Sequence, residues 1–264
     1  MSNVVGRRAV VTTLAVAATL GLAGTAYALE INGTPGNDSI KGSRNADVID
    51  AGAGNDRVRA LGGDDSVKGG PGNDRIMGNQ GNDTLIGDAN NVGDLTSFDR
   101  IWGGRGNDTL YGGDSRDRLW GGDGDDTSYG QNGNDLMGGG PGNDKQYGGP
   151  GNDLIYAGRG VDETFGEDGN DVLWALARAD VQGPNDTAGD TLHGGPGNDR
   201  FKTRDGEQDN IDCGPGSDTA LLDFKDVIVD ATAQNPNGSC EVVNRRAPKP
   251  HEDKPENATP PEGH

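Results

Sequence analysis

The nine residues Gly103-Gly104-Arg105-Gly106-Asn107-Asp108-Thr109-Leu110-Tyr111 contain the pattern that decides the fold. In both directions from Asp108 an aspartate recurs every nine residues, with extra residues only after Asp83, after Asp171 and before Asp209. The aspartates in this frame are Asp38, Asp47, Asp56, Asp65, Asp74, Asp83, Asp99, Asp108, Asp117, Asp126, Asp135, Asp144, Asp153, Asp162, Asp171, Asp190, Asp199, Asp209 and Asp218. A frame kept over so many copies argues against a random acidic tract and indicates a repeat architecture.

Each unit reads as a glycine-rich turn of six residues followed by a strand of three. Glycine permits positive φ and close approach of neighbouring backbones, so such a turn can point its carbonyl groups inward. Two positions after most of the aspartates lies one apolar side chain, such as Ile76 or Leu110. Each three-residue strand therefore carries one inward apolar side chain.

The oxygen atoms of these turns favour calcium. Ca²⁺ prefers six to eight carboxylate and carbonyl oxygens in flexible geometry, whereas Mg²⁺ demands stricter octahedra and retains waters. One turn does not supply that many ligands, but two stacked turns do. We therefore expect each ion to lie between repeats and to join them.

This repeat resembles the RTX (repeats-in-toxin), or hemolysin-type calcium-binding, family, and the resemblance covers about residues 33–221. It implies an all-β fold, a parallel β-roll in which two nonapeptides complete one turn. It also implies that the motif aspartates and turn carbonyls hold calcium between the turns of this calcium-bound β-solenoid. All nineteen in-frame aspartates are therefore candidate metal ligands.

Several copies depart from the pattern and predict weaker or empty sites. The third glycine is Asn45 or Ser115 in two units, Ala60-Leu61 replaces a glycine pair, and Ser128 and Thr164 stand at apolar positions. If a site needs two turns on the same side, and if the insertions interrupt the stacks, about eleven calcium ions are expected.

Composition agrees with a fold that depends on cations. The 264 residues include 48 glycines and 43 acidic against 23 basic side chains, giving a net charge of −20, and only 30% are hydrophobic. Such a chain lacks the core of a conventional enzyme domain, and its charge argues against nucleic acid as a partner. We expect it to be unfolded without calcium and a rigid solenoid with calcium, since metal binding would supply the free energy of folding.

Residues 1–28 have the pattern of a secretory signal peptide. Arg7 and Arg8 precede a short apolar run from Ala9 to Ala23, and a small-x-small site predicts cleavage after Ala28. A retained membrane anchor is the alternative, but the run is short for a bilayer. The mature chain is thus expected to be secreted, extracellular and not inserted into a membrane, with a net charge of about −22.

The rest of the chain divides into three parts. Residues 29–219 form the expected roll, with insertions near 90–98 and 175–189; residues 220–246 form an expected C-terminal cap; and residues 247–264 form a Pro-rich tail expected to be disordered. Cys213 and Cys240 suit a disulfide in an oxidising compartment, with two buried free thiols as the alternative.

No catalytic constellation is found. The chain has three histidines, and it has neither a His-Glu-x-x-His helix nor a Gly-x-Ser-x-Gly elbow. We predict a calcium-binding protein that is not an enzyme.

Aromatic residues recur every 18 residues through the middle of the chain. These are Tyr111, Tyr129, Tyr147 and Phe165, then Trp102 and Trp120, then Tyr156 and Trp174. Two nonapeptides per turn would stack them into outward ladders, whose simplest role is to stabilise the sheets. The alternative is an adhesive surface for a glycan, a cell wall or a partner protein.

Overall fold

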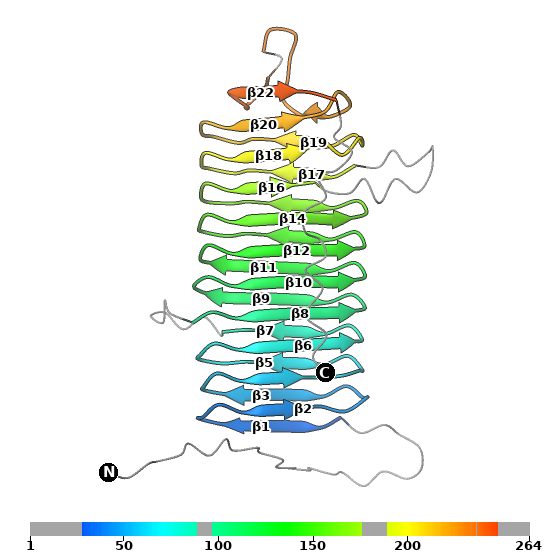
Figure 1. Ribbon diagram of the computed structural model, residues 1–264, viewed down its shortest axis with the longest axis vertical. Coiled ribbons are helices and arrows are strands. Elements are labelled where there is room, and N and C mark those ends of the chain that lie inside the picture. Colours follow the sequence, from blue (N-terminus) through cyan, green and yellow to red (C-terminus); the bar gives the residue numbers. More distant parts are fainter. Residues whose placement is uncertain (1–27, 89–96, 176–188, 236, 248–264) are drawn as a thin grey trace, which may run out of the picture.

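The computed structural model describes residues 28–88, 97–175, 189–235 and 237–247, and there the chain forms a stack of parallel strands (Figure 1). The strands alternate between two eleven-stranded sheets. The odd-strand sheet contains β1 (Glu30–Thr34), β3 (Val48–Gly52), β5 (Ser66–Lys68), β7 (Thr84–Ile86), β9 (Thr109–Asp114), β11 (Thr127–Asn132), β13 (Lys145–Tyr147), β15 (Glu163–Phe165), β17 (Thr191–His193), β19 (Asn210–Asp212) and β21 (Val227–Ile228). The even-strand sheet contains β2 (Ser39–Lys41), β4 (Arg57–Arg59), β6 (Arg75–Gln80), β8 (Arg100–Arg105), β10 (Arg118–Asp123), β12 (Leu136–Pro141), β14 (Leu154–Arg159), β16 (Val172–Trp174), β18 (Arg200–Thr203), β20 (Thr219–Leu222) and β22 (Val242–Arg245).

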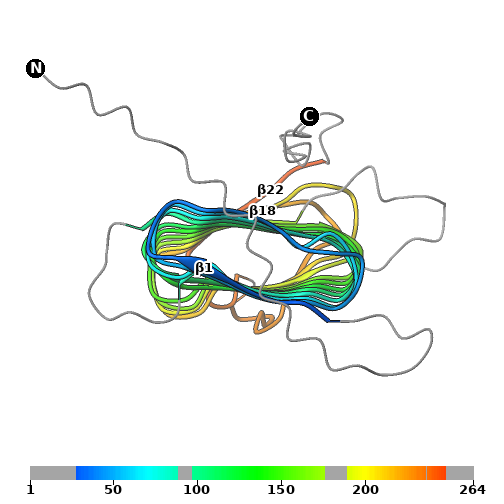
Figure 2. The same cartoon turned by 90° about the horizontal axis from the view of Figure 1, so that it is seen from below.

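The predicted all-β parallel β-roll is confirmed. Viewed along its axis, the molecule is a flattened tube whose two long sides are the sheets (Figure 2). Thr109 pairs with Thr127, 18 residues later, so two nonapeptides make one turn. Some strands are longer than the expected three residues, because the second half of β8, β10 and similar strands extends into the glycine turn.

The insertions do not interrupt the stack. Arg75 pairs directly with Arg100 and Glu163 with Thr191, so in both places the next turn resumes the register of the stack. Most of the expected insertions, residues 89–96 and 176–188, lie outside the described residues.

Most strands contribute one large inward-facing side chain to the core, which is therefore thin. The fully buried side chains include Ile49, Ile76, Leu85, Ile101, Leu110, Leu119, Met137, Ile155, Leu173, Leu192, Phe201 and Ile211. Buried polar residues interrupt this row in β11, β13 and β15, at Ser128, Gln146 and Thr164. The Gln146 Nε2 donates to the carbonyl of Tyr156 at 3.1 Å, and the Thr164 hydroxyl donates to Gln146 Oε1 at 3.3 Å. These bonds satisfy Gln146 and Thr164, and the apolar core is divided into two clusters, the first ending at Ile155 and the second beginning at Leu173.

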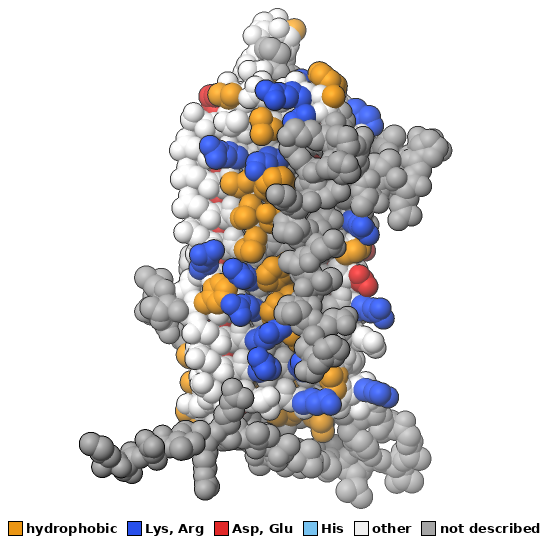
Figure 3. All heavy atoms as spheres, in the orientation of Figure 1, with side chains coloured by type: hydrophobic (Ala, Val, Ile, Leu, Met, Phe, Trp, Pro, Cys, Tyr) orange, Lys and Arg blue, Asp and Glu red, His pale blue; other side chains and the backbone are white. Residues whose placement is uncertain are grey.

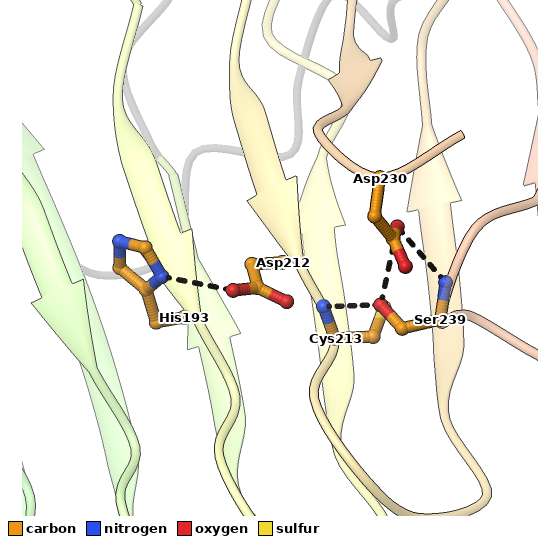
Figure 4. A network of polar contacts seen from close by, with 5 residues as sticks. All are labelled: His193, Asp212, Cys213, Asp230 and Ser239. Atoms are coloured by element: carbon orange, nitrogen blue, oxygen red, sulfur yellow. Dashed lines mark hydrogen bonds and ion pairs between the residues drawn. The ribbon is translucent and has the colours of Figure 1, made fainter. Parts of the chain in front are cut away.

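The C-terminal segment expected as a cap supplies the last strands of both sheets, β20 to β22. The predicted Cys213–Cys240 disulfide is present and joins the end of β19 to the chain just before β22. Beside it the Ser239 hydroxyl accepts from the Cys213 amide, while Asp230 accepts from Ser239 (Figure 4). These contacts hold the last loop against the sheets.

The expected signal peptide falls almost entirely outside the described residues, as does all but the first residue of the expected tail. Within the described ranges, no helix is long and apolar enough to cross a membrane.

Candidate metal-binding turns

The glycine turns connect the two sheets and stack into two columns, one on each narrow side of the flattened tube. The turns of the first column precede the even-numbered strands, as Asp99 precedes β8, and those of the second column precede the odd-numbered strands, as Asp108 precedes β9. All nineteen predicted aspartates lie in these columns at the same place in each turn, and every one is buried. The structure thus collects the candidate ligands into two lines and leaves none of them outside.

Within a column, each aspartate is bonded to the next. The backbone N–H of Asp108 donates to Oδ1 of Asp126 at 2.7 Å, and that of Asp126 donates to Oδ1 of Asp144 at 2.8 Å. The same bond crosses both insertions, from Asp74 to Asp99 and from Asp162 to Asp190. One carboxylate oxygen in each turn is therefore committed to holding the turns in register.

The second carboxylate oxygen, Oδ2, accepts no hydrogen bond in most turns. In the described part of the chain, Oδ2 has no hydrogen-bond partner and is fully buried in Asp56, Asp65, Asp74, Asp83, Asp99, Asp108, Asp117, Asp126, Asp135, Asp144, Asp153, Asp171, Asp199, Asp209 and Asp218. A buried anionic oxygen without a partner is costly and is normally paired with a cation or a metal.

In most of these turns the free oxygen lies close to a carbonyl oxygen of the next turn in the column. A Cβ placed on Gly103 would be 2.2 Å from Asp108 Oδ2 and 2.5 Å from the carbonyl oxygen of Gly121. Gly121 repeats this, with Asp126 Oδ2 at 2.2 Å and the Gly139 carbonyl oxygen at 2.7 Å. A carboxylate oxygen and a carbonyl oxygen thus face the same small space between turns. Carboxylate and carbonyl oxygens are the ligands that calcium prefers, so the residues present fit the ion.

The backbone of the turn brings neighbouring turns this close. Gly104 has a φ of +124°, and a Cβ there would be 2.4 Å from the carbonyl oxygen of Asn79 in the preceding turn. Of the expected departures, Leu61 and Ser115 keep the left-handed backbone, with φ of +90° and +93°. Such a backbone is strained for residues with a Cβ, which supports the prediction that their turns are weaker.

Burial raises the pKa of the aspartates strongly. The pKa rises to about 9 for Asp99 and Asp144, and to about 8 for Asp108 and Asp135. Desolvation is the largest cause in all four, the hydrogen bond to the preceding turn opposes it, and carboxylates of adjacent turns add repulsion. Near neutral pH these turns require either a proton or a cation.

Side chains alone do not form a metal site here. Across the described residues, no group of three or more Asp, Glu, His or Cys side chains is arranged to hold a metal. Each space between turns offers the carboxylates of two aspartates, so a calcium shell must be completed by carbonyl oxygens, as the sequence predicts.

Sequence reasoning missed the ends of both columns. The amide of Asp209 donates to Oδ1 of Asp226 at 3.3 Å, and the amide of Asp218 donates to Glu241 Oε2 at 2.6 Å. A signal was available, because a buried or half-buried apolar residue follows each acid by two positions, Ile228 and Val243.

In many turns the residue before the aspartate, most often asparagine, belongs to a second, exposed ladder that was also not foreseen. The amide of Asn73 donates to Oδ1 of Asn55, 18 residues earlier, and Asn152 does the same to Asn134. These bonds run opposite to the aspartate bonds and tie the turns from outside.

The geometry defines a parallel β-solenoid whose turns carry stacked, cation-demanding carboxylates. The family described as RTX calcium-binding nonapeptide repeat matches the chain over residues 32–67, 59–91, 96–128, 117–146, 138–173 and 186–220. The chain therefore belongs to this family, as the resemblance of its repeat predicted, and its repeats are calcium-binding repeats. No curated protein matches it.

Proposed function

We propose that this protein is a secreted calcium-binding roll in which binding of several Ca²⁺ ions between stacked turns completes folding outside the cell. The observation that carries the proposal is the buried Oδ2 without a partner, repeated turn after turn beside a carbonyl oxygen of the next turn. The nineteen in-frame aspartates would be the carboxylate ligands, and the first glycine of the adjacent turn would supply a carbonyl. Bound calcium would neutralise the buried carboxylates and bridge successive turns.

The number of ions follows from how the turns stack. The expectation of about eleven assumed that the insertions break the columns, yet the aspartate bonds cross both of them. With ten in-frame aspartates in the first column and nine in the second, the spaces between turns number nine and eight. We propose that about eleven to seventeen ions bind, the weaker spaces being those beside Asn45, Leu61 and Ser115.

Export is supported by two features. The predicted signal peptide ends at Ala28, just before β1, and the Cys213–Cys240 disulfide suits an oxidising compartment. Extracellular calcium is commonly high enough to fill weak sites, so export would couple to folding.

The test is far-ultraviolet circular dichroism of residues 29–264, titrated with calcium after EDTA, with magnesium as the control. We expect a cooperative gain of β signal with calcium and little with magnesium. A spectrum unchanged by calcium would overturn the proposal.

A second candidate function is adhesion through the aromatic ladder of the odd-strand sheet. Tyr111, Tyr129, Tyr147 and Phe165 are stacked as predicted, with centroids 4.8–5.0 Å apart, and His193 extends the stack at 4.7 Å. All five rings are half-exposed, so the stack forms a continuous aromatic surface that a glycan, cell wall or protein could contact. Changing Tyr111, Tyr129 and Tyr147 to Ser tests it: lost attachment with intact calcium-induced folding supports adhesion, whereas simple destabilisation supports a stabilising role.

A further inference from the structure

The second column of turns starts at Leu29, which occupies the place of an aspartate. Leu29 lies 18 residues before Asp47 and directly precedes β1, just as Asp47 directly precedes β3. Its backbone N–H donates to Oδ1 of Asp47 at 2.9 Å, and its carbonyl accepts from the amide of Val48 at 2.7 Å. Asp47 repeats the first of these bonds towards Asp65, at 2.7 Å. Among the described residues, Leu29 therefore supplies the first backbone donor of this column.

The first column has no such donor. It starts with Asp38, whose Oδ1 is buried and, within the described part of the chain, accepts no hydrogen bond. One turn later the same oxygen is satisfied, because Asp56 Oδ1 accepts from the amide of Asp38 at 2.7 Å. A buried anionic oxygen without a partner is costly. The nitrogen at position 29 thus removes from the second column a cost that the first column retains.

Asp47 is hydrogen-bonded through both of its oxygens, yet no described cation pairs with it. The Ser43 amide donates to Oδ2 at 2.6 Å and the Ser43 hydroxyl donates to Oδ1 at 3.0 Å. Asp47 is only 1% exposed. The basic side chains gather on the outside of the roll (Figure 3), and of those described none forms an ion pair with Asp47. A buried carboxylate in this position is stabilised by a cation within hydrogen-bond distance.

The predicted signal-peptide cleavage would change the charge of the Leu29 nitrogen. Hydrolysis of the Ala28–Leu29 peptide bond consumes one water, whose hydroxyl goes to the Ala28 carbonyl carbon. The hydrogen of that water and the proton released by the new carboxyl group go to the Leu29 nitrogen, which becomes an ammonium. Free α-amino groups carry this proton near neutral pH. Ala28 is exposed, so the N–H groups of the ammonium that do not point at Asp47 can reach water.

We propose that removal of the signal peptide places the ammonium group of Leu29 on the carboxylate of Asp47 and thereby closes the N-terminal end of the roll. The nitrogen that becomes charged already donates to Asp47, so the ion pair requires no rearrangement of β1. Hydrogen bonds between charged groups are roughly twice as strong as neutral ones. The proposal rests on the proposed secretion, and it adds that processing itself stabilises the mature fold.

Only one cleavage position produces this ion pair. The pairs Glu30–Val48 and Ile31–Ile49 fix the register of β1 on β3, so the residue at position 29 is the one that reaches Asp47. One extra residue before Leu29 would leave a neutral amide at this place and move the ammonium away from Asp47. One residue fewer would remove both the donor and the carbonyl that accepts from Val48.

The test compares three forms of the calcium-loaded protein that differ only at this nitrogen. One begins with the free amine of Leu29, the second is the same chain acetylated at that amine, and the third carries one additional glycine before Leu29. Hydrogen exchange near neutral pH reports on the protection of β1 and β3. We expect exchange there to be at least about tenfold slower in the first form than in the other two. Exchange from β9 to β15 should be the same in all three, since each turn of a solenoid contacts only its neighbours.

Asp47→Asn shows whether the carboxylate of Asp47 is the partner of the ammonium. The new amide oxygen can still accept from Leu29, so the three forms of this variant should exchange within about twofold of one another. Asp50→Asn is the matched control, because Asp50 is exposed and its bond from the Gly52 amide, at 3.2 Å, is kept by an amide oxygen. The three forms of the control should keep the tenfold difference.

Three results would overturn the proposal: equal exchange in the three forms of the native sequence, a difference that persists in Asp47→Asn, or an exported protein whose first residue is not Leu29. The first residue is read by mass spectrometry of the secreted chain. A failure of the proposed function is distinguishable, because it would appear as a lack of calcium-induced folding in every form. A protein that folds with calcium but shows equal exchange contradicts only the ion pair between Leu29 and Asp47.

Discussion

The amide nitrogen of Asp108 donates a hydrogen bond to Oδ1 of Asp126, 2.7 Å away, although both side chains are buried acids one turn apart. The bond that stacks the turns therefore also brings the two carboxylates close, and repulsion from Asp126 is among the causes that raise the pKa of Asp108. Stacking and charge compensation are linked in every space between turns, so a cation that relieves the repulsion stabilises the register of the whole column.

Replacing Asp126 by Asn should remove a calcium ligand while keeping the stacking bond. The amide oxygen of the new side chain can still accept from the backbone N–H of Asp108, so only the anionic Oδ2 is lost. Calorimetry should count at least one bound calcium ion fewer than in the native protein. In the presence of calcium the free energy of unfolding should fall by about 2 kcal/mol.

Asp125→Asn is the matched control for this change. Asp125 is exposed and accepts from the amide of Asn143 at 2.8 Å, a role that an amide oxygen keeps. It removes the same charge one residue away, so its ion count should equal that of the native protein. Equal losses in the two variants would show that net charge, and not the buried oxygen, governs binding.

Replacing Gly103 by Ala should close one inter-turn space. Its Cβ would lie 2.2 Å from Asp108 Oδ2 and 2.5 Å from the Gly121 carbonyl oxygen, the two oxygens that are proposed to bind the ion. In the presence of calcium we expect the free energy of unfolding, measured with urea, to fall by about 2 kcal/mol or more. The calcium concentration at the midpoint of folding should rise. Gly138→Ala is the control, because its Cβ would meet only the Trp120 ring, at 3.2 Å and beyond. If the Gly103→Ala variant binds calcium like the native protein, these two oxygens do not bind the ion.

The fold could be predicted from the sequence because each nine-residue repeat specifies both a turn and a strand. Glycine positions, the buried aspartate and one inward aliphatic such as Leu110 repeat together, so local and tertiary requirements agree in every copy. The ladders Tyr111–Tyr129 and Trp102–Trp120 followed from the same period, and both pairs are stacked, with interplanar angles of 6° and 8°.

The rest depends on features that the period does not contain. Gln146 at an inward position is tolerated only because Tyr156 and Thr164 satisfy its amide, which no local pattern reveals. Continuity of the columns across the insertions depends on register between distant strands, as in the Asp74–Asp99 bond. Likewise, Arg57, Arg75 and Arg100 lie side by side on the even-strand sheet only because turns 18 and 25 residues apart are stacked in register.

Removing the disulfide should loosen only the C-terminal end. In a solenoid each turn contacts its neighbours, so loss of a terminal tether propagates weakly. For the Cys213→Ser/Cys240→Ser variant we expect the free energy of local unfolding at the C-terminal end to fall by about 3 kcal/mol. Hydrogen exchange in calcium should show faster exchange in β21 and β22 and unchanged protection from β3 to β15. A uniform increase in exchange along the roll would contradict this.

Without calcium, the roll should be favoured by acid. The folded-state pKa of Asp99 and Asp144 is raised to about 9, and that of Asp117 and Asp126 to about 7, with burial as the first cause. The unfolded chain titrates near pH 4, so between about pH 4 and pH 9 the folded state binds more protons than the unfolded chain. Its free energy of unfolding must therefore fall as the pH rises through that window.

Circular dichroism in EDTA at pH 4, 7 and 9 measures this directly, and the β signal should be largest at pH 4. Calcium replaces the protons, so adding it should restore the signal most at pH 7 and 9, with a calcium midpoint that falls as the pH rises. The Asp126→Asn variant should lose less stability between pH 4 and 9 than the native chain, because it has one fewer buried group to ionise. A metal-free β signal that grows with pH would contradict the burial of these carboxylates, since groups with raised pKa values cannot stabilise the fold by losing protons.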